Sequence, residues 1–187
     1  TWGAPHQGIF GSPGILDQRF SWLNILELYA YKLFYLYPIQ KYISIASYWK
    51  DPLHHEEYIN QCLFLPHANN EVEHVYNEIY RENIESLDYF IMVNSDAEEM
   101  ITPSASCHFE FYQIGSNRQI QPFLESEQYH KNLLGLKTLY DQDKLLFKTA
   151  HCSHMNYTID KENFIENTLP YLLDNSNMTK NHHVNAK

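Results

Sequence analysis

Two short apolar runs, residues 87–93 and 144–149, constrain the fold of this chain more than any other feature. Both have the length and aliphatic or aromatic content of buried strands, and helix-like stretches lie between and after them. After each run the chain becomes polar before a helix resumes, as it does at the carboxyl end of a strand in an α/β protein. We therefore expect an α/β architecture with parallel strands.

The polar loops after these runs carry the residues with the clearest chemistry. The first loop offers Asp96, Glu98 and Glu99, and the second offers His151 and His154. An imidazole that acts as a general base is oriented by a carboxylate, and spacing alone lets any of the three acids do this or form a solvated acidic turn. In an α/β-hydrolase the catalytic residues come in the order serine, acid, histidine, each after a strand. The two loops fit the last two positions.

A nucleophile is harder to find in the sequence. No segment has the form Gly-x-Ser-x-Gly, and no base is placed beside Cys107 or Cys152. Together with Cys62, these cysteines lack the spacing of a zinc site or of a disulfide framework. One disulfide and one free thiol would be compatible with the three cysteines. We expect the nucleophile to lie in a part of the protein that is absent here, and the isolated 187 residues to be inactive.

Charge and histidine content restrict the partners. The formal net charge is −10 at pH 7 and no basic stripe occurs, which argues against a nucleic-acid partner. The 11 histidines would bring the chain toward neutrality in an acidic compartment, and a drift in composition explains them equally well. Adjacent histidine pairs, as at His54-His55, point apart on a helix, so we expect no metal and no other cofactor.

We interpret residues 1–174 as one domain portion with a helical insertion at about 16–87, followed by a polar tail at 175–187. Pro38 should split the insertion into two amphipathic helices. The apolar stretch before it is too short and too charged to form a stable membrane span. Its aromatic residues recur at helical spacing and either pack on the core or line an acyl groove: Trp22, Tyr29, Tyr31, Phe34 and Tyr35.

The remaining elements are predicted from local patterns. A helix is expected at 71–87, a hairpin at 109–124 around Gly115, and a helix at 130–141. A final helix is expected at 157–173, with Thr158 or Asp160 as its N-cap. Two Asn-x-Thr triplets, at Asn156 and Asn177, are glycosylation acceptors if the chain is secreted.

Several short strings, taken in order, resemble the palmitoyl-protein thioesterases. They cover about residues 1–173 and are specific in combination, and three of them, at residues 100–103, 134–139 and 153–154, lean toward the second, lysosomal type. The strings are Pro5-His-Gln-Gly-Ile-Phe-Gly11, Ser47-Tyr-Trp-Lys-Asp-Pro52, Asp88-Tyr-Phe-Ile-Met-Val93, Met100-Ile-Thr-Pro103, Phe109-Glu-Phe-Tyr112, Leu134-Gly-Leu-Lys-Thr-Leu139 and Ser153-His154.

The resemblance implies the C-terminal part of an α/β-hydrolase, lysosomal or secreted, that cleaves long-chain fatty-acyl thioesters by serine acylation. His154 falls at the family's histidine and Glu98 at its aspartate. A glutamate at this position departs from the family's pattern, and its extra methylene moves the carboxylate by about 1 Å. Asp96 could take the role of the acid if the loop were rearranged. A lipase or carboxylesterase of the same fold and a non-catalytic lipid-binding relative are the alternatives.

Overall fold

The computed structural model describes residues 1–11, 29 and 31–172. Trp22, Asn177, the tail at 175–187 and the start of the predicted helical insertion lie outside these residues. No helix in the described part of the chain is long and apolar enough to cross a membrane.

A parallel pair of strands forms the centre of the sheet. Strand β1 (Phe90–Ser95) pairs with β4 (Leu145–Ala150), in register from Phe90 opposite Leu145 to Ser95 opposite Ala150. The two predicted strands and the α/β class are therefore confirmed. Strand β1 begins later than expected because the backbone N–H of Leu87 still donates to Ile84 O, at 3.1 Å, in the turn that ends the preceding helix.

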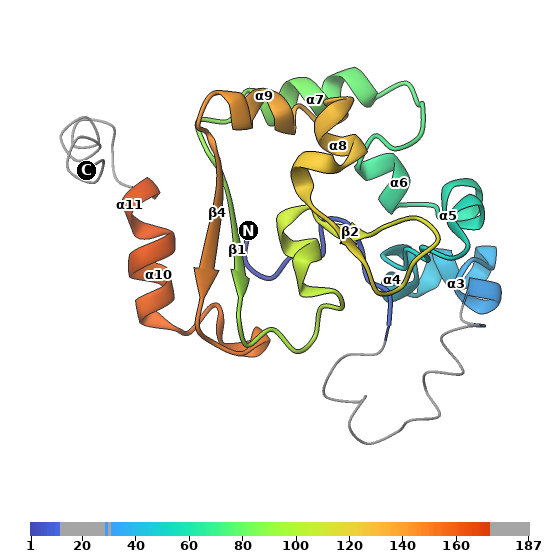
Figure 1. Ribbon diagram of the computed structural model, residues 1–187, viewed down its shortest axis with the longest axis horizontal. Helices are drawn as coiled ribbons and strands as arrows, with labels where there is room; N and C mark the ends of the chain where they lie inside the picture. Colours follow the sequence, from blue (N-terminus) through green and yellow to red (C-terminus); the bar gives the residue numbers. More distant parts are fainter. Residues whose placement is uncertain (12–28, 30, 173–187) are drawn as a thin grey trace.

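The first residues of the chain extend the sheet on the other side of β1. Trp2 forms a parallel bridge with Val93, whose N–H donates to Thr1 O at 2.9 Å and whose carbonyl accepts from Gly3 N at 2.9 Å. In Figure 1 this amino-terminal segment lies beside β1, opposite β4. Three chain segments far apart in sequence thus end at one edge of the sheet.

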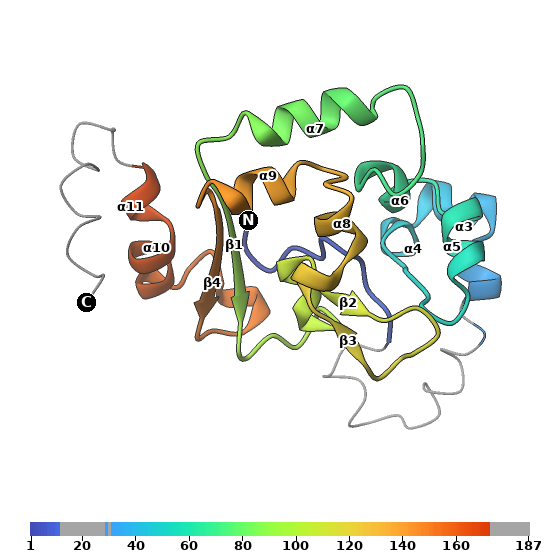
Figure 2. The ribbon, with the colours of Figure 1, turned by 45° about the horizontal axis from the view of Figure 1, so that its top comes forward.

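Short helices surround the sheet. In Figure 1, α10 (Lys161–Asn167) and α11 (Leu169–Leu172) lie on one side of β4. Helices α7 (Asn77–Glu85) and α9 (Leu136–Asp141) cross the amino-terminal end of the strands. Figure 2 shows α7 above α9, and the hairpin of β2 (Phe111–Tyr112) and β3 (Ile120–Gln121) below α8 (Glu127–His130). After residue 36, the described helices before β1 are α3 (Tyr37–Tyr42), α4 (Ser44–Ser47), α5 (His55–Gln61), α6 (Leu65–Ala68) and α7.

The predicted break at Pro38 is confirmed. Residues 31–34 are helical, and α3 then starts anew at Tyr37 with the proline in its first turn, where its missing N–H is not needed. Tyr37 and Tyr42 are exposed, whereas Tyr35 and Trp49, on the two sides of the proline, pack inward. The latter two belong to a buried cluster that we call the insertion cluster, made of Phe10, Tyr35, Trp49, Tyr58, Cys62, Leu65 and Phe111.

The segment between the two strands holds a hairpin and several short helical turns. Strands β2 (Phe111–Tyr112) and β3 (Ile120–Gln121) are antiparallel, with Gly115 at φ +84 in the turn, as predicted. The other elements are η1 (Ser104–His108), η2 (Phe123–Glu125), α8 (Glu127–His130) and α9 (Leu136–Asp141). The single helix expected at 130–141 is wrong, because Asn132 and Gly135 adopt positive φ and separate α8 from α9.

The predicted final helix is also divided. A turn of η3 (His154–Asn156) comes first, and α10 (Lys161–Asn167) begins after Asp160, whose side chain accepts from Asn163 N as an N-cap. Helix α10 ends at Asn167, with Thr168 as its C-cap, and α11 (Leu169–Leu172) follows. Pro170 explains the division, because a proline has no N–H for the helical ladder and its ring crowds the carbonyl four residues before it.

Candidate active site

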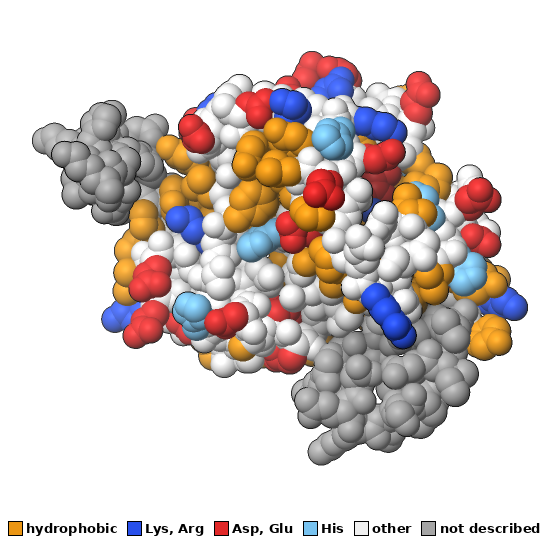
Figure 3. Space-filling model, viewed as in Figure 1, with side chains coloured by type: hydrophobic (Ala, Val, Ile, Leu, Met, Phe, Trp, Pro, Cys, Tyr) orange, Lys and Arg blue, Asp and Glu red, His pale blue; other side chains and the backbone are white. Residues whose placement is uncertain are grey.

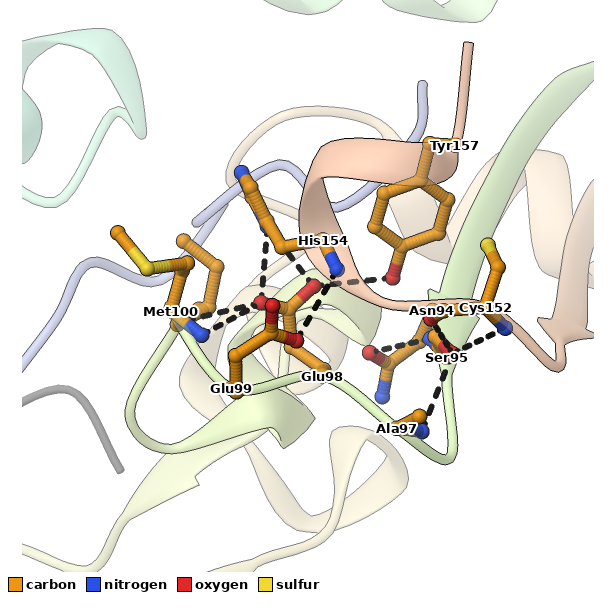
Figure 4. A network of polar contacts seen from close by, with 10 residues as sticks. Asn94, Ser95, Ala97, Glu98, Glu99, Met100, Cys152, His154 and Tyr157 are labelled. Carbon is orange, nitrogen blue, oxygen red and sulfur yellow. Dashed lines mark hydrogen bonds and ion pairs between the residues drawn. The ribbon is translucent and has the colours of Figure 1, made fainter. Parts of the chain in front are cut away.

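The loops that follow β1 and β4 meet at the carboxyl end of the sheet and are joined by one buried hydroxyl. Ser95 Oγ, 3% exposed as a residue, donates to Cys152 O at 2.5 Å and accepts from Cys152 N at 3.2 Å and Ala97 N at 3.1 Å. Figure 4 shows this serine between the two loops. The hydroxyl therefore fixes the acid loop relative to the histidine loop.

The acid loop and the histidine loop bring Glu98 and His154 into direct contact. Nδ1 of His154 lies 2.8 Å from Oε1 and 2.9 Å from Oε2 of Glu98. The side chain of Glu98 is 0% exposed and that of His154 is 26% exposed. One carboxylate buried behind one partly open imidazole is the arrangement that a histidine base requires.

Further donors hold the Glu98 carboxylate in place. Oε1 accepts from the backbone N–H groups of Met100 at 2.9 Å and Ile101 at 3.1 Å, and Oε2 accepts from the Tyr157 hydroxyl at 3.0 Å. On the other side, Glu99 Oε2 accepts from the backbone N–H of His154 at 3.0 Å. Both the acid and the backbone of the histidine are thus fixed before any substrate is present (Figure 4).

Burial and hydrogen bonding act in opposite directions on the Glu98 pKa. Burial is the largest single effect and would raise the pKa, but the hydrogen bonds from His154, Met100 and Ile101 together outweigh it and leave the pKa below its usual value. The Tyr157 pKa is raised, first by burial and then by the charge of Glu98, so the phenol keeps its proton and can donate it. Glu98 is therefore a carboxylate that can stabilise a protonated imidazole.

The orientation of the His154 ring leaves one nitrogen available. In Figure 4 the ring edge opposite to Nδ1 points away from Glu98. When Nδ1 donates its proton to the carboxylate, Nε2 carries the lone pair that can take a proton from a nucleophile. Among the residues that the structure describes, no hydroxyl or thiol is hydrogen-bonded to this Nε2.

The competing residues form a different pair. His151 Nδ1 lies 2.6 Å from Asp96 Oδ2, and the two side chains are 77% and 58% exposed. The alternatives that spacing left open are thus sorted into a buried pair and a surface pair. Only the buried pair holds its imidazole in a fixed orientation.

Two residues that sequence reasoning missed form the wall behind Glu98. Gly3 has φ +52, and a Cβ on it would lie 2.5 Å from a ring carbon of Tyr157 and 3.2 Å from Glu98 Oε2. A glycine after the bridge formed by Trp2 is thus needed for both backbone conformation and space. In the sequence, only the presence of a glycine at position 3 could have indicated this wall. Nothing in the local sequence distinguishes Tyr157 from the other tyrosines.

The cysteines do not provide a nucleophile. All three are buried free thiols, so no pair forms among them. The Cys107 pKa is raised to about 12, first by burial and then by the charge of Glu98, and the Cys152 pKa is raised mainly by burial. Thiols in this state are not thiolates near neutral pH.

The described aromatic residues of the insertion differ in their surroundings. Tyr35 is buried in the insertion cluster, and Phe34 packs edge-on against Trp49 with ring centroids 4.8 Å apart. Tyr31 stacks on His54 at 3.6 Å, and Tyr29 is 59% exposed. Their assignment to an acyl groove stays a prediction.

Asn156 lies exposed in η3, and its use as a glycan acceptor also stays a prediction. In the described part of the chain, no three His, Cys, Asp or Glu side chains are grouped so that they could hold a metal ion.

Comparison with protein families decides the relationship of the chain. The model of the palmitoyl protein thioesterase family matches residues 1–154, from the first residue of the chain to His154. The chain belongs to this family. The match spans both loops of the buried pair and the helical insertion.

Individual relatives agree with this assignment. Palmitoyl-protein thioesterase 3 of Dictyostelium discoideum is 35% identical over 176 residues, 92% of this chain and 58% of the relative. Palmitoyl-protein thioesterase 1 of Caenorhabditis elegans is 31% identical over 156 residues, 82% of this chain and 50% of the relative. Lysosomal thioesterase PPT2 of Homo sapiens is 29% identical over 136 residues, 73% of this chain and 43% of the relative. The chain thus spans about half the length of these relatives. Its assignment to the second, lysosomal type of the family stays a prediction.

Proposed function

We propose that the protein containing this chain hydrolyses long-chain fatty-acyl thioesters, with His154 as the general base and Glu98 as its orienting acid. The observation that carries the proposal is the buried contact of Glu98 with His154 Nδ1, at 2.8 and 2.9 Å. Membership of the palmitoyl protein thioesterase family and the names of the relatives support the substrate class.

The same evidence supports the finer architecture. The parallel strands, with an acid after β1 and a histidine after β4, fit the C-terminal part of an α/β-hydrolase within residues 1–174, and residues 16–87 would form its helical insertion. The serine nucleophile would come from a part of the protein outside these 187 residues.

The proposed reaction is serine acylation followed by hydrolysis. His154 Nε2 takes the serine proton as the oxygen attacks the thioester carbonyl, and the imidazolium, stabilised by Glu98, returns that proton to the leaving thiolate. Water then attacks the acyl-serine ester while His154 again accepts and returns one proton. The products are a free thiol and a fatty acid, and no cofactor takes part.

Glutamate in place of the family's aspartate is compatible with this role. Its longer side chain reaches His154 while Oε1 accepts from Met100 N and Ile101 N, so the loop folds around the carboxylate. Asp96 is not needed for this geometry, because it contacts His151 instead. These contacts favour an enzyme over a non-catalytic lipid-binding relative.

A lysosomal or secreted location is part of the proposal. Relatives of the chain are named lysosomal thioesterases, and the 11 histidines fit an acidic compartment. A lipase or carboxylesterase of the same fold is less favoured, because the matched family and the relatives are named for thioesters.

The test compares two histidine variants in a protein that contains the chain together with its nucleophile. We expect His154→Ala to lower kcat/KM for palmitoyl-CoA by about 10³-fold or more, and His151→Ala to change it by less than about twofold. A matched oxygen ester of palmitate should react more slowly than the thioester. Equal losses in the two variants, or a preference for the oxygen ester, would contradict the proposal.

A further inference from the structure

Tyr157 contacts both members of the buried pair. Its hydroxyl donates to Glu98 Oε2 at 3.0 Å, and its ring meets the His154 imidazole edge to face, with ring centroids 5.8 Å apart and planes at 86°. The residue is 3% exposed. A buried phenol that touches a carboxylate and its histidine can hold the two side chains in one arrangement.

Helix α10 and strand β4 fix the position of Tyr157. Its carbonyl accepts from Asn163 Nδ2 at 3.0 Å, and Asn163 Oδ1 accepts from Asn167 Nδ2, also at 3.0 Å. Asn167 Nδ2 in turn donates to Thr149 O in β4 at 3.2 Å. The two asparagines are buried, so water does not compete for these bonds. The phenol is therefore held by elements that do not belong to the acid loop.

The contacts of the Glu98 carboxylate come from two different loops. Oε1 accepts from Met100 N and Ile101 N, which belong to the acid loop itself. The other two contacts, with His154 Nδ1 and with the Tyr157 hydroxyl, come from the segment after β4. A side chain that is one methylene shorter would keep its place in the acid loop and would withdraw by about 1 Å or more from that segment. The distance between the two loops thus fits a glutamate.

Negative charge alone does not distinguish Glu98 from its neighbours. Figure 3 shows acidic and histidine side chains on the surface around the carboxyl end of the sheet, at the lower left. Asp96 contacts the exposed His151, and Glu99 accepts from the backbone N–H of His154. Glu98 is the acid that receives the Tyr157 hydroxyl.

We propose that Tyr157 is a positioning residue that holds Glu98 against His154 and fits the site to a glutamate rather than to the shorter aspartate. The proposal rests on the proposed function, in which Glu98 orients His154. By donating to Oε2, the phenol keeps the carboxylate from turning away while the imidazole gains and loses its proton. Tyr157 acts through Glu98 and does not touch the reacting atoms.

The test is a double-mutant cycle with palmitoyl-CoA, in a protein that contains the chain together with its nucleophile. Tyr157→Phe removes the hydroxyl and keeps the ring, so we expect kcat to fall about tenfold with KM within about twofold of the wild type. Glu98→Asp keeps the charge and moves it, so we expect kcat to fall about 10²-fold. The double variant should match Glu98→Asp within about twofold, because the shorter carboxylate no longer reaches the hydroxyl.

The cycle separates positioning from a defect in folding. A substitution that only lowered the folded fraction would reduce kcat by the same factor in either background, and the two losses would multiply. Matched controls change an exposed hydroxyl and an exposed carboxylate. Tyr76→Phe and Asp96→Glu should each alter kcat by less than about twofold.

Three results would overturn the inference and leave Glu98 as the acid. They are wild-type kcat in Tyr157→Phe, wild-type kcat in Glu98→Asp, and losses that multiply to about 10³-fold in the double variant. Glu98→Gln, measured in the same assay, tests the level below. Activity of Glu98→Gln within about twofold of the wild type would overturn both the inference and the assignment of Glu98 in the proposed function.

Discussion

Two carboxylate–imidazole pairs lie at the same edge of the sheet, and only their surroundings distinguish them. In one, Glu98 is fully buried and receives two backbone N–H groups and a tyrosine hydroxyl besides His154 Nδ1. In the other, Asp96 and His151 are 58% and 77% exposed. The distances are similar, so proximity does not identify a catalytic pair.

The difference teaches what makes a carboxylate useful to a histidine. An exposed ion pair is screened by water and is free to separate, and such pairs contribute about 0–1 kcal/mol to stability. A buried carboxylate whose other lone pairs are occupied can only face its imidazole, and it interacts with the charged ring in a lower dielectric. The following experiments test whether this distinction holds.

The largest effect is expected on catalysis. In a protein that contains the chain and its nucleophile, Glu98→Gln should lower kcat/KM for palmitoyl-CoA by about 10³-fold or more, because the imidazolium loses its compensating charge and its fixed tautomer. The matched change in the exposed pair, Asp96→Asn, should alter the rate by less than about twofold. Full activity of Glu98→Gln with loss in Asp96→Asn would reverse the assignment of the two pairs.

A smaller effect is expected when the carboxylate loses one of its supports. Tyr157→Phe removes the hydroxyl that donates to Glu98 Oε2 and should lower the free energy of unfolding of the 187-residue chain by about 2 kcal/mol, measured in urea. Tyr76→Phe removes an exposed hydroxyl and should change this free energy by less than about 0.5 kcal/mol. Equal effects would mean that the Tyr157 bond adds no stability.

The pH dependence of stability gives the finest comparison. The pKa of Glu98 in the folded state is below its ordinary value of 4.5, so its contribution to stability is fully present above that value and is lost as the pH falls through the folded-state pKa. The difference in unfolding free energy between the wild type and Glu98→Gln should therefore shrink as the pH is lowered from about 6 to about 3. The difference for Asp96→Asn should stay small throughout, and a Glu98 difference that grows on acidification would contradict the sign.

The strands and the order of the two loops could be predicted from the sequence, because burial of a parallel strand leaves a continuous apolar run. The sequence of the two loops left three acids and two histidines as candidates for the carboxylate–imidazole pair. Which carboxylate meets which imidazole depends on the backbone path after β1, where Met100 and Ile101 turn their N–H groups toward Glu98. That path is a tertiary property and leaves no spacing rule in the chain.

The breaks in the predicted helices have a similar cause. Gly135 separates α8 from α9 at φ +80, and a Cβ on it would lie 2.3 Å from the Glu85 side chain of α7. The roles of Gly3 and Tyr157 depend likewise on a contact between opposite ends of the described chain. Local propensity has no information about such contacts.

The pairing of distant segments at the sheet also bears on how the site forms. Ser95 and Ala150 are 55 residues apart, and the Trp2 indole donates to Thr168 across 166 residues at 3.0 Å. Closing such long loops is entropically unfavourable until the whole sheet is assembled, and folds with distant contacts form slowly. Glu98 and His154 should therefore come together only in the final cooperative step, so amide hydrogens near Ser95 and Cys152 should exchange with solvent only when the entire sheet opens.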